Sequence, residues 1–439
     1  MKPTTTTKYA VALAALAAIT ALPVAAQDSV TLITNSYRTG GFSGSGIPLG
    51  NGMRDYIALV NAKGGVNGVK INFEECETGY DTKKSVECYE QAKAKNNILY
   101  LPWSTGATLA AIPRLHVDKT PLLSMSYGLS AGADGATFPW VFNPPLTYWD
   151  GASVALNYIA GKEGGMDKLK GKKIGLIYLD APYGKEPIPF LTNMSKKHGF
   201  ELQLYPVPAA EMQNQGALWL NIRRDKPDYL YSQGFGAMSP TAVKEAVKNS
   251  FPMDHFVSVW WAGGDNDAQA GGTEAKGYKS VTWHQVGTNV PLIQEIIKEV
   301  VDKGQSLTEK SKVGEAQYNR TVYQGVLVTE AIRNAQKLTG KKVINAEDMR
   351  RGLETLEITD ARWKELGLEG FAAAMKVTCG DHSGHNKAFI TEWDGAKWVK
   401  ASDWFAPSTD EVLPLIAAAA ADYAKTDGFP KRSEACDAK

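Results

Sequence analysis

The sequence predicts an α/β fold of two doubly wound, Rossmann-like lobes that are joined by a multi-strand hinge. Three observations support this prediction. Short apolar runs rich in β-branched residues alternate with amphipathic helical stretches, which is typical of a parallel sheet covered by helices. The alternation occurs twice, on either side of the proline-containing segment 142–145, and many of the runs end in loops of Gly, Ser or Thr.

The first series of elements forms the first lobe. Its predicted strands are 30–35, 69–75, 98–101 and 121–123, and its predicted helices are about 50–63, 82–95 and 107–116. Met53, Ile57 and Val60 share one helical face, and Gly64-Gly65 follows as a stop signal. Segment 142–145 then interrupts the pattern. Its two prolines fix φ and exclude a helix, so we expect a hinge strand there.

The second series repeats the topology without repeating the residues, and it forms the second lobe. Its predicted strands are 173–180, 201–207, 228–231 and 256–261, and its predicted helices are 148–160, 186–198, 219–224 and 240–249. Residues 277–284 are predicted as a strand that returns to the first lobe. Helices at 291–302, 319–337 and 346–356 follow, then strands at 375–378, 387–393 and 397–400, and a last helix that begins at Ser408.

These elements divide the chain into two discontinuous lobes. The expected boundaries are 1–26 for a signal peptide, 27–143 with about 284–370 for the first lobe, 144–283 with about 371–405 for the second lobe, and 406–439 for a C-terminal helix and tail. The chain would then cross between the lobes near Asn143, near His284 and between Leu368 and Lys376.

The N-terminus has the pattern of a cleaved secretory signal. Lys2 and Lys8 precede an apolar run from Tyr9 to Leu22, and small residues end at Ala26, after which we expect cleavage. The apolar run is short for a bilayer, and no later run approaches about 18 residues, so we expect a protein that is exported to the periplasm without a membrane anchor. Without Lys2 and Lys8, 46 of the 48 basic residues remain against 47 acids. This balance argues against nucleic acid or an anionic membrane as a partner.

Four cysteines are present, which is enough for two disulfide bonds in an oxidising compartment. Three pairings are possible from sequence alone, and four free buried thiols are the alternative. We favour Cys76 with Cys88, because they flank one strand-to-helix junction, and Cys379 with Cys436, because that bond would hold the C-terminal tail.

Polar loops follow the first-lobe strands. Ser104-Thr105-Gly106 and Ser124-Met125-Ser126-Tyr127-Gly128 come after neighbouring strands, so both should emerge at the carboxyl edge of the sheet, where ligands bind. The glycine-rich loop 37–46 follows the first strand but lacks a dinucleotide or P-loop motif. Arg38 in that loop could bond both oxygens of a ligand carboxylate, or it could form a surface salt bridge.

Aromatic residues also gather at the exits of predicted strands. They are Trp103, Tyr127, Tyr183, Phe235, Trp260 and Trp261. Some of them should belong to the core. Those that face the cleft from both lobes could clamp an apolar or planar ligand.

We expect a binding protein without enzymatic activity and without a cofactor. The sequence contains no HExxH or CxxC motif. Cys379, His382 and His385 have a spacing that could ligate zinc, but a disulfide would consume Cys379, so no metal is predicted.

Five segments together resemble a known family. They are NAKGGVNG (61–68), the STG and SMSYG loops, DAPYGKE (180–186) and CGDHSGHNKAFITEWDGAKW (379–398). The chain resembles the type I periplasmic solute-binding proteins of ABC importers, and within them the leucine/isoleucine/valine-binding subfamily. The resemblance implies a Venus-flytrap fold, a small ligand between the lobes, and a membrane permease as the partner of a monomeric receptor.

The resemblance also implies which residues bind the ligand. A ligand carboxylate would be held by hydroxyl and backbone N–H groups of Ser104, Thr105, Ser126 and Gly128, with Ser45 reaching from the glycine-rich loop. Tyr183 would close over the ligand, and Phe235 and the region from Trp260 to Gly263 would complete the second-lobe wall. Amino-acid-binding members place a glutamate after the last of these strands. Here the stretch is WWAGGD, with Asp265 as the only near substitute.

This departure leaves several ligands open. A branched-chain or other amino acid is the first expectation, and an aromatic acid or a short amide is the alternative. A secreted hydrolase is a further alternative, although no nucleophile and base pair is found. A receptor-linked sensor normally needs a transmembrane helix, and a repressor of similar fold needs a DNA-binding headpiece.

Overall fold

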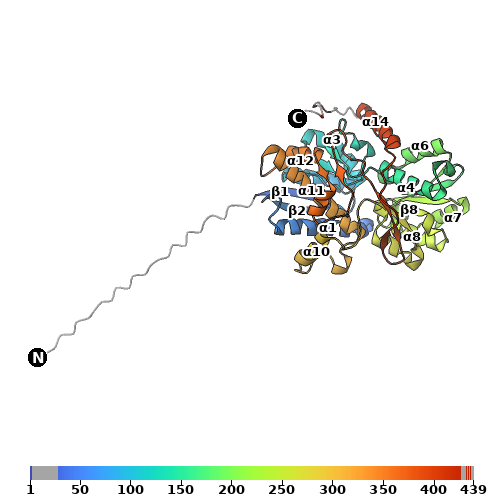
Figure 1. Ribbon diagram of the computed structural model, residues 1–439, viewed down its shortest axis with the longest axis horizontal. Helices are drawn as coiled ribbons and strands as arrows, with labels where there is room; N and C mark the ends of the chain where they lie inside the picture. Colours follow the sequence, from blue (N-terminus) through green and yellow to red (C-terminus); the bar gives the residue numbers. More distant parts are fainter. Residues whose placement is uncertain (2–27, 427–431, 433, 435, 437–439) are drawn as a thin grey trace.

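The structure is a computed structural model that describes residues 1, 28–426, 432, 434 and 436. The predicted signal peptide and its cleavage point lie outside the described residues. Two α/β lobes lie side by side, the first drawn in blue, cyan and orange and the second in green and yellow (Figure 1). The predicted fold class, an α/β fold with two lobes, is confirmed.

The first lobe is built on a short parallel sheet. Strand β1 (Ser29–Ser36) pairs with β2 (Lys70–Glu77), and β3 (Leu122–Leu123) pairs with β4 (Val141–Phe142). Residues 97–101 connect the two pairs through isolated bridges from Thr31 to Asn97 and from Tyr100 to Leu122. The sheet order is therefore β2, β1, residues 97–101, β3, β4, so the loops after these strands share one edge.

Helices on this sheet come from two distant parts of the chain. The early ones are α1 (Ser43–Ala62), α2 (Thr82–Ala94) and α3 (Thr105–Asp118), and the late ones are α10 (Pro291–Ile296), α11 (Ala316–Thr339), α12 (Ala346–Glu354) and α13 (Asp360–Glu365). A π turn (Ile297–Val301) follows α10. Helices α1 and α11 pack closely because Gly52 carries no Cβ, which would lie 2.3 Å from the Tyr318 carbonyl oxygen.

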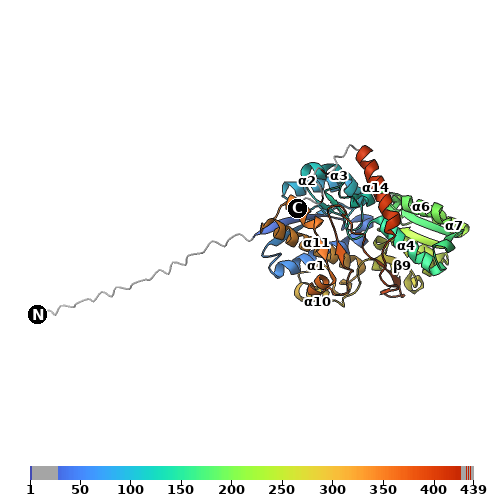
Figure 2. The ribbon, with the colours of Figure 1, turned by 45° about the horizontal axis from the view of Figure 1, so that its top comes forward.

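The second lobe contains a seven-stranded sheet in the order β13, β12, β9, β8, β7, β5, β6. The strands are β5 (Lys173–Leu179), β6 (Glu201–Val207), β7 (Tyr229–Gln233), β8 (Phe256–Ser258), β9 (Lys279–Thr282), β12 (Phe389–Trp393) and β13 (Trp398–Lys400). Strands β5 to β9 are parallel, and β12 and β13 are antiparallel to their neighbours. The helices of this lobe are α4 (Tyr148–Glu163), α5 (Pro182–Lys185), α6 (Ile188–His198), α7 (Gly216–Asp225), α8 (Met238–Lys248) and α9 (Asp265–Gln269). Figure 2 shows α4 and α6 beside this sheet.

Residues 277–284 contain the predicted strand, β9, which belongs to the sheet of the second lobe. Strand β9 pairs with β8 on one side and with β12 on the other, and all four of its residues are buried. Strand β9 is therefore an internal strand of the second sheet, with a hydrogen-bonded neighbour on each side. The chain crosses only afterwards, where His284 bridges to Ala372. A small antiparallel pair of strands, β10 (Glu357–Ile358) and β11 (Met375–Lys376), adjoins this crossing.

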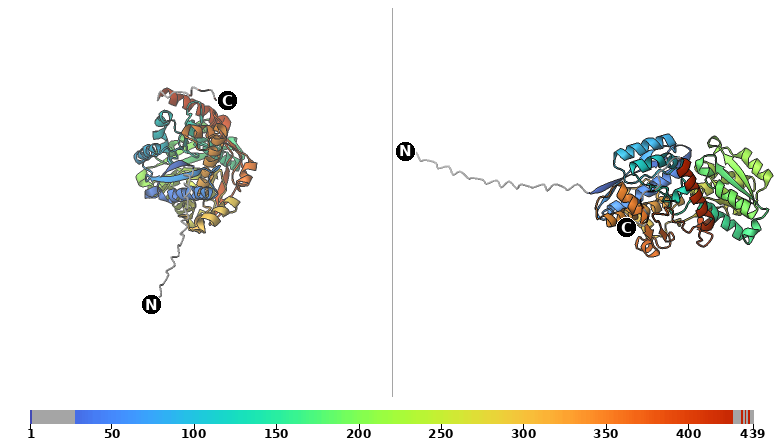
Figure 3. Two further views of the ribbon diagram at one scale, coloured as in Figure 1. Left: turned by 90° about the vertical axis from the view of Figure 1, so that its left-hand side faces the viewer. Right: turned by 90° about the horizontal axis from the view of Figure 1, so that it is seen from above.

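The C-terminal helix α14 (Thr409–Thr426) lies along both lobes. It contacts α4 of the second lobe and the 3-10 turn η2 (Ser130–Ala133) of the first lobe. Seen from above, the red helix runs along the boundary between the lobes (Figure 3). The two predicted disulfides, Cys76–Cys88 and Cys379–Cys436, are both present. The second disulfide ties the tail to a hinge segment.

The glycine-rich segment 37–46 is shorter as a loop than predicted. A 3-10 turn (Gly40–Phe42) leads directly into α1, which begins at Ser43 rather than near Gly50. Gly46 permits this early start, because a Cβ there would lie 2.1 Å from the Tyr37 carbonyl oxygen. Ser45 is consequently a helical residue.

Candidate functional site

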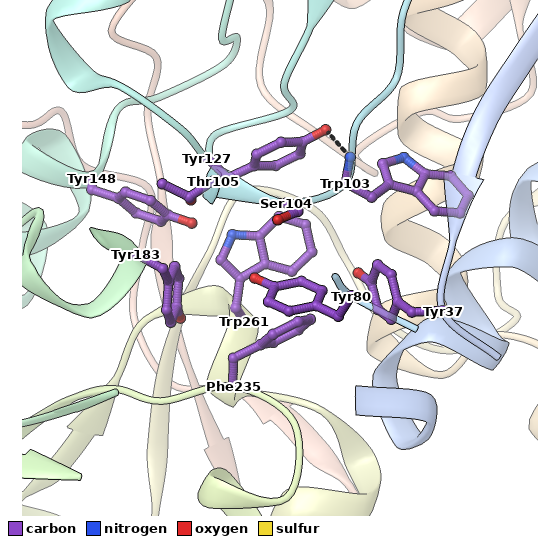
Figure 4. A pocket seen from close by; sticks show the side chains of 10 residues that line it. All are labelled: Tyr37, Tyr80, Trp103, Ser104, Thr105, Tyr127, Tyr148, Tyr183, Phe235 and Trp261. Atoms are coloured by element: carbon purple, nitrogen blue, oxygen red, sulfur yellow. Dashed lines mark hydrogen bonds between the residues drawn. The ribbon is translucent and has the colours of Figure 1, made fainter. Parts of the chain in front are cut away.

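A small pocket lies between the two lobes at the carboxyl edges of both sheets. The space between its lining side chains, including the part that is open to solvent, is about 210 Å³. The lining residues are Tyr37, Tyr80, Trp103, Ser104, Thr105, Tyr127, Tyr148, Tyr183, Phe235 and Trp261 (Figure 4). Eight of the ten are aromatic, and no acidic or basic side chain is among them. The pocket therefore suits a small ligand with an apolar or planar body.

The polar part of the lining belongs to the start of α3. Ser104 is the N-cap of this 14-residue helix, and its hydroxyl oxygen accepts from the Ala107 N–H at 3.3 Å. Thr105 is the first helical residue, and its side-chain oxygen accepts from the Gly128 N–H at 3.2 Å. A helix N-terminus carries unpaired N–H groups and a partial positive charge. This end of the pocket can therefore bind a carboxylate.

Trp103 is held in an unusual backbone conformation directly before this helix. Its φ is 46°, which bulky residues rarely adopt. Its N–H donates to the Tyr127 hydroxyl oxygen at 2.7 Å, the bond drawn in Figure 4, and its indole Nε1–H donates to Gln324 at 2.8 Å. These two bonds fix the backbone and the side chain of Trp103, so the wall is preformed.

The second-lobe wall is almost entirely aromatic. Tyr183 lies on α5 and donates its hydroxyl hydrogen to the Gly234 carbonyl oxygen at 2.7 Å. The ring of Phe235 is 6.0 Å from that of Tyr183 and 6.0 Å from that of Trp261. Because the Tyr183 hydroxyl is used inside its own lobe, its ring is the part that is offered to a ligand.

Phe235 also reaches across to the first lobe. Its ring centroid is 5.6 Å from that of Phe42, 5.4 Å from that of Tyr80 and 6.0 Å from that of Tyr37. Two hydrogen bonds join the lobes nearby: the Ala237 N–H donates to the Gly41 carbonyl at 2.9 Å, and Trp260 Nε1–H donates to the Ser126 carbonyl at 3.2 Å. The lobes are therefore closed on one another.

Burial keeps the pocket tyrosines neutral. It raises the pKa values of Tyr80, Tyr127 and Tyr183 well above their usual value, chiefly through loss of solvation. These phenols are therefore uncharged hydrogen-bonding groups near neutral pH, and they do not repel an anion.

Seven predicted site residues line the pocket. They are Trp103, Ser104, Thr105, Tyr127, Tyr183, Phe235 and Trp261. The other six, which are Arg38, Ser45, Ser126, Gly128, Trp260 and Asp265, are not among its lining residues.

Arg38 is engaged elsewhere. Its Nε and Nη2 donate to the two carboxylate oxygens of Glu75 at 2.7 and 2.9 Å, and Nη1 donates to Asn51 at 2.9 Å. The bond to Glu75 raises the pKa of Arg38. The predicted contact of Arg38 with the ligand is therefore corrected to its alternative, a salt bridge. Nε, Nη1 and Nη2 of the guanidinium already donate to residues of the first lobe.

Four of the remaining residues are buried but do not line the pocket. Ser126 has a φ of 55°, and its side-chain oxygen accepts from the Leu146 N–H. Its carbonyl oxygen accepts from the Trp260 indole N–H. The Gly128 N–H is bonded to Thr105, and the buried Ser45 lies on α1. Trp260 stacks on the pocket residue Tyr148 with centroids 5.8 Å apart.

Asp265 serves a helix end rather than the pocket. Its carboxylate accepts from the Ala316 N–H at 2.8 Å, at the start of α11. The neighbouring Asp267 accepts from the Gly264 N–H at 2.9 Å. Burial raises the pKa of Asp265 and raises that of Asp267 to about 8. Neither carboxylate lines the pocket, so neither takes the position that the family resemblance implied for a glutamate.

Sequence reasoning missed three lining residues, Tyr37, Tyr80 and Tyr148. Tyr37 directly follows β1, and Tyr80 lies three residues after β2, so both obey the strand-exit pattern already used for the other aromatics. Tyr148 opens α4 after the proline-containing crossover. Applying the pattern to every strand, including the first two, would have found Tyr37 and Tyr80.

The histidine-rich segment has structural roles. Cys379 is in a disulfide, the His382 ring Nδ1 is 2.7 Å from the Val141 carbonyl oxygen, and the His385 ring Nδ1 is 2.9 Å from Asp150. Among the described residues, no group of three or more His, Cys, Asp and Glu side chains is arranged to hold a metal. Within the same residues, no helix has the length and apolar character needed to cross a membrane.

Comparison with known proteins places these features in context. A family profile described as periplasmic binding protein matches residues 34–397. A structure described as an ABC transporter permease from the Pseudomonas fluorescens group is 37% identical, covers 92% of this chain and 99% of its own, and has a TM-score of 0.85. No curated protein matches the chain.

Two more distant structures share the fold. A branched-chain amino acid ABC transporter protein from Thermus thermophilus with bound valine is 20% identical, with a TM-score of 0.76, and covers 89% of this chain and 99% of its own. A solute-binding protein from R. palustris in complex with benzoate is 13% identical, with a TM-score of 0.68, and covers 86% of this chain and 97% of its own.

Proposed function

Because the chain belongs to the periplasmic binding protein family, we propose that it is the solute receptor of an ABC importer. It captures a small carboxylate-bearing solute between its lobes and delivers it to a membrane permease. The observation that carries this proposal is the closed pocket, whose lining comes from both lobes. A receptor needs such a pocket, because contacts with both lobes exist together only in the closed state.

Each end of the pocket supports one part of the ligand. Ser104, Thr105 and the start of α3 suit a carboxylate, and the rings of Tyr183, Phe235 and Trp261 suit an apolar or aromatic body. An amino acid also needs a partner for its ammonium group, and no acidic residue lines the pocket. Among carboxylates, an apolar or aromatic acid therefore fits better than a branched-chain amino acid, which is the second candidate.

Ligand binding is coupled to lobe closure. The crossing segments near Asn143, His284 and Ala372 form the hinge, and closure brings Phe235 onto the rings of the first lobe. A ligand that touches both walls stabilises the closed state by the difference between its contacts in the two states. The receptor performs no chemistry in this scheme, since the lining holds no histidine or carboxylate to act as a base.

The proposed location is the periplasm. The predicted signal peptide would direct export, and two disulfides are typical of an oxidising compartment. We propose a monomer that docks on its permease in the closed form.

A ligand screen tests the receptor role. Thermal shift followed by calorimetry would compare branched-chain amino acids, aromatic acids, aliphatic acids and short amides. A ligand at 100 times its dissociation constant should raise the free energy of unfolding by about 2.7 kcal/mol. We expect stabilisation by carboxylates with apolar bodies at a 1:1 ratio and without turnover. Conversion of a stabilising compound to a product would refute the non-enzymatic role.

A further inference from the structure

Helix α11 lies directly behind the pocket and contacts both of its tryptophans. Gln317, Arg320 and Gln324 follow one another at spacings of three and four residues, so they share one face of the helix. Gln324 accepts from the Trp103 indole at 2.8 Å, and Gln317 donates to the Trp261 carbonyl oxygen at 3.3 Å. Arg320 lies between these two residues on the helix, so only the side chains that line the pocket separate it from the pocket.

Arg320 is buried between two indole rings. It is 1% exposed. Its guanidinium carbon lies 5.2 Å from the ring centroid of Trp261, which lines the pocket, and 5.0 Å from that of Trp283. A cation close to an aromatic ring is attracted by the quadrupole of that ring, which offsets only part of the cost of burying the charge.

The hydrogen bonds of Arg320 all go to neutral acceptors. Nε donates to His284 Nε2 at 3.1 Å, and Nη1 donates to the Gln317 side-chain oxygen at 3.2 Å and to the Trp260 carbonyl. Burial holds the pKa of His284 well below its usual range, so its ring is uncharged. Among the described residues, Arg320 forms no ion pair with a carboxylate within 4.0 Å.

Two acidic groups, Asp265 and Asp267, act electrostatically on Arg320 without forming an ion pair with it. Asp265 and Asp267 are bonded to the backbone N–H groups of Ala316 and Gly264. Burial raises the pKa of Asp267 to about 8, so this group is largely protonated at neutral pH. Burial lowers the pKa of Arg320 only to about 9, so the guanidinium stays charged there. A buried cation is thus left without an ion pair beside a pocket that has no charged lining.

We infer that Arg320 supplies the counter-charge for an anionic ligand and makes the pocket select carboxylates over primary amides of the same shape. The inference rests on the proposed receptor function and narrows its ligand class. The charge acts across the Trp261 ring, while Ser104 and Thr105 provide the direct hydrogen bonds. Arg320 is accordingly a specificity-determining residue that need not touch the ligand.

Matched pairs of ligands isolate the effect of this charge. The probes are isovalerate with isovaleramide, benzoate with benzamide, and phenylacetate with phenylacetamide, measured by calorimetry at pH 7. The variants are Arg320→Gln, which removes the charge, and Arg320→Lys, which keeps it. Arg333→Gln is the control, because Arg333 lies on the same helix and is paired with Glu330 at 3.2 Å.

We expect the wild type to bind the acid of at least one pair about tenfold more tightly than its amide. An opposite charge about 12 Å away at an effective dielectric constant of about 20 has an effect of this size. Arg320→Gln should weaken the acid about tenfold and leave the amide within about twofold. Arg320→Lys should retain most of the preference, and Arg333→Gln should retain all of it.

Each other outcome decides against the inference in a distinct way. Equal weakening of acid and amide in Arg320→Gln would show a purely structural role, and an unchanged preference would show no role. A wild type that binds amides as tightly as acids overturns the selectivity while the receptor function stands. If no probe and no other small solute binds, the receptor function falls as well. If Arg320→Gln does not fold, a loss of preference in Arg320→Lys decides against the inference.

Discussion

The two walls of the pocket differ in chemistry although the two lobes share a topology. The first-lobe wall combines hydroxyl groups and a helix N-terminus at Ser104 and Thr105 with aromatic rings. The second-lobe wall consists of the rings of Tyr148, Tyr183, Phe235 and Trp261. Its tyrosine hydroxyl at residue 183 is bonded inside its own lobe.

The difference indicates a division of labour between the lobes. A carboxylate placed at the start of α3 would be oriented by directional bonds before closure. The second lobe would then cover the body of the ligand, and this step depends on buried area rather than on direction. Substitutions of the first-lobe hydroxyl groups should therefore weaken the binding of acids selectively. Substitutions of the second-lobe rings should weaken the binding of acids and amides alike.

Removing Phe235 should have the largest effect. Its ring contacts the pocket and the rings of Tyr37, Phe42 and Tyr80 in the first lobe, so Phe235→Ala loses ligand contact and closure together. We expect affinity to fall about 100-fold for acids and amides alike, equivalent to about 3 kcal/mol. Calorimetry measures this.

Phe251→Ala is the matched control for that substitution. Phe251 lies in the same lobe and packs on Trp219 and Phe256, away from the pocket. It should lower the free energy of unfolding without changing affinity. Unchanged affinity in Phe235→Ala would contradict the proposed second wall.

Removing the Ser104 hydroxyl should have the next largest effect and should be selective for acids. Ser104→Ala deletes a donor to the ligand carboxylate and also the α3 cap, so we expect about tenfold weaker binding of acids and about 1 kcal/mol less stability. Asp81→Ala removes the cap of α2, where Asp81 accepts from the Lys84 N–H at 2.8 Å. This control should lose similar stability and keep its affinity.

A buried carboxyl group between the lobes should make lobe closure depend on pH. Glu186 of the second lobe accepts from the Ser130 hydroxyl at 2.9 Å across the cleft, and burial raises its pKa to about 7. A raised carboxyl pKa favours the closed state at low pH, and this advantage is lost as the pH rises through about 7. Acid binding should weaken about threefold to tenfold from pH 6 to pH 8.

Glu186→Gln should flatten that pH profile, because an amide does not titrate. The probe acids stay ionised over this range, so their own titration does not interfere. A variant that keeps the wild-type slope would place the titrating group elsewhere.

The smallest effect is expected for Tyr183→Phe. The hydroxyl bonds to the Gly234 carbonyl oxygen and not to the first lobe, so the ring and the ligand contact remain. Affinity should change less than about threefold, with stability lower by about 1 kcal/mol. A tenfold loss in calorimetry would mean that the hydroxyl binds the ligand directly.

Much of the fold could be predicted because it depends on local pattern. Alternation of strands and helices predicted both lobes, and the strand exits predicted the position of seven lining residues. The strand within residues 277–284 was predicted, but its pairing with β12 was not. Strand β12 comes more than 100 residues later in the chain, so no local signal marks this pairing.

By itself, the sequence predicted the two-lobed architecture and the sheet edge at which the pocket lies, and it favoured the disulfide pairing that the structure has. Periodicity and strand exits carry that information within a few neighbouring residues. Only the tertiary structure decided that Arg38 pairs with Glu75, that Phe235 closes on rings of the other lobe and that Arg320 is buried without an ion pair. These features depend on which distant residues face each other after packing, and that choice is made by the whole core rather than by any single segment.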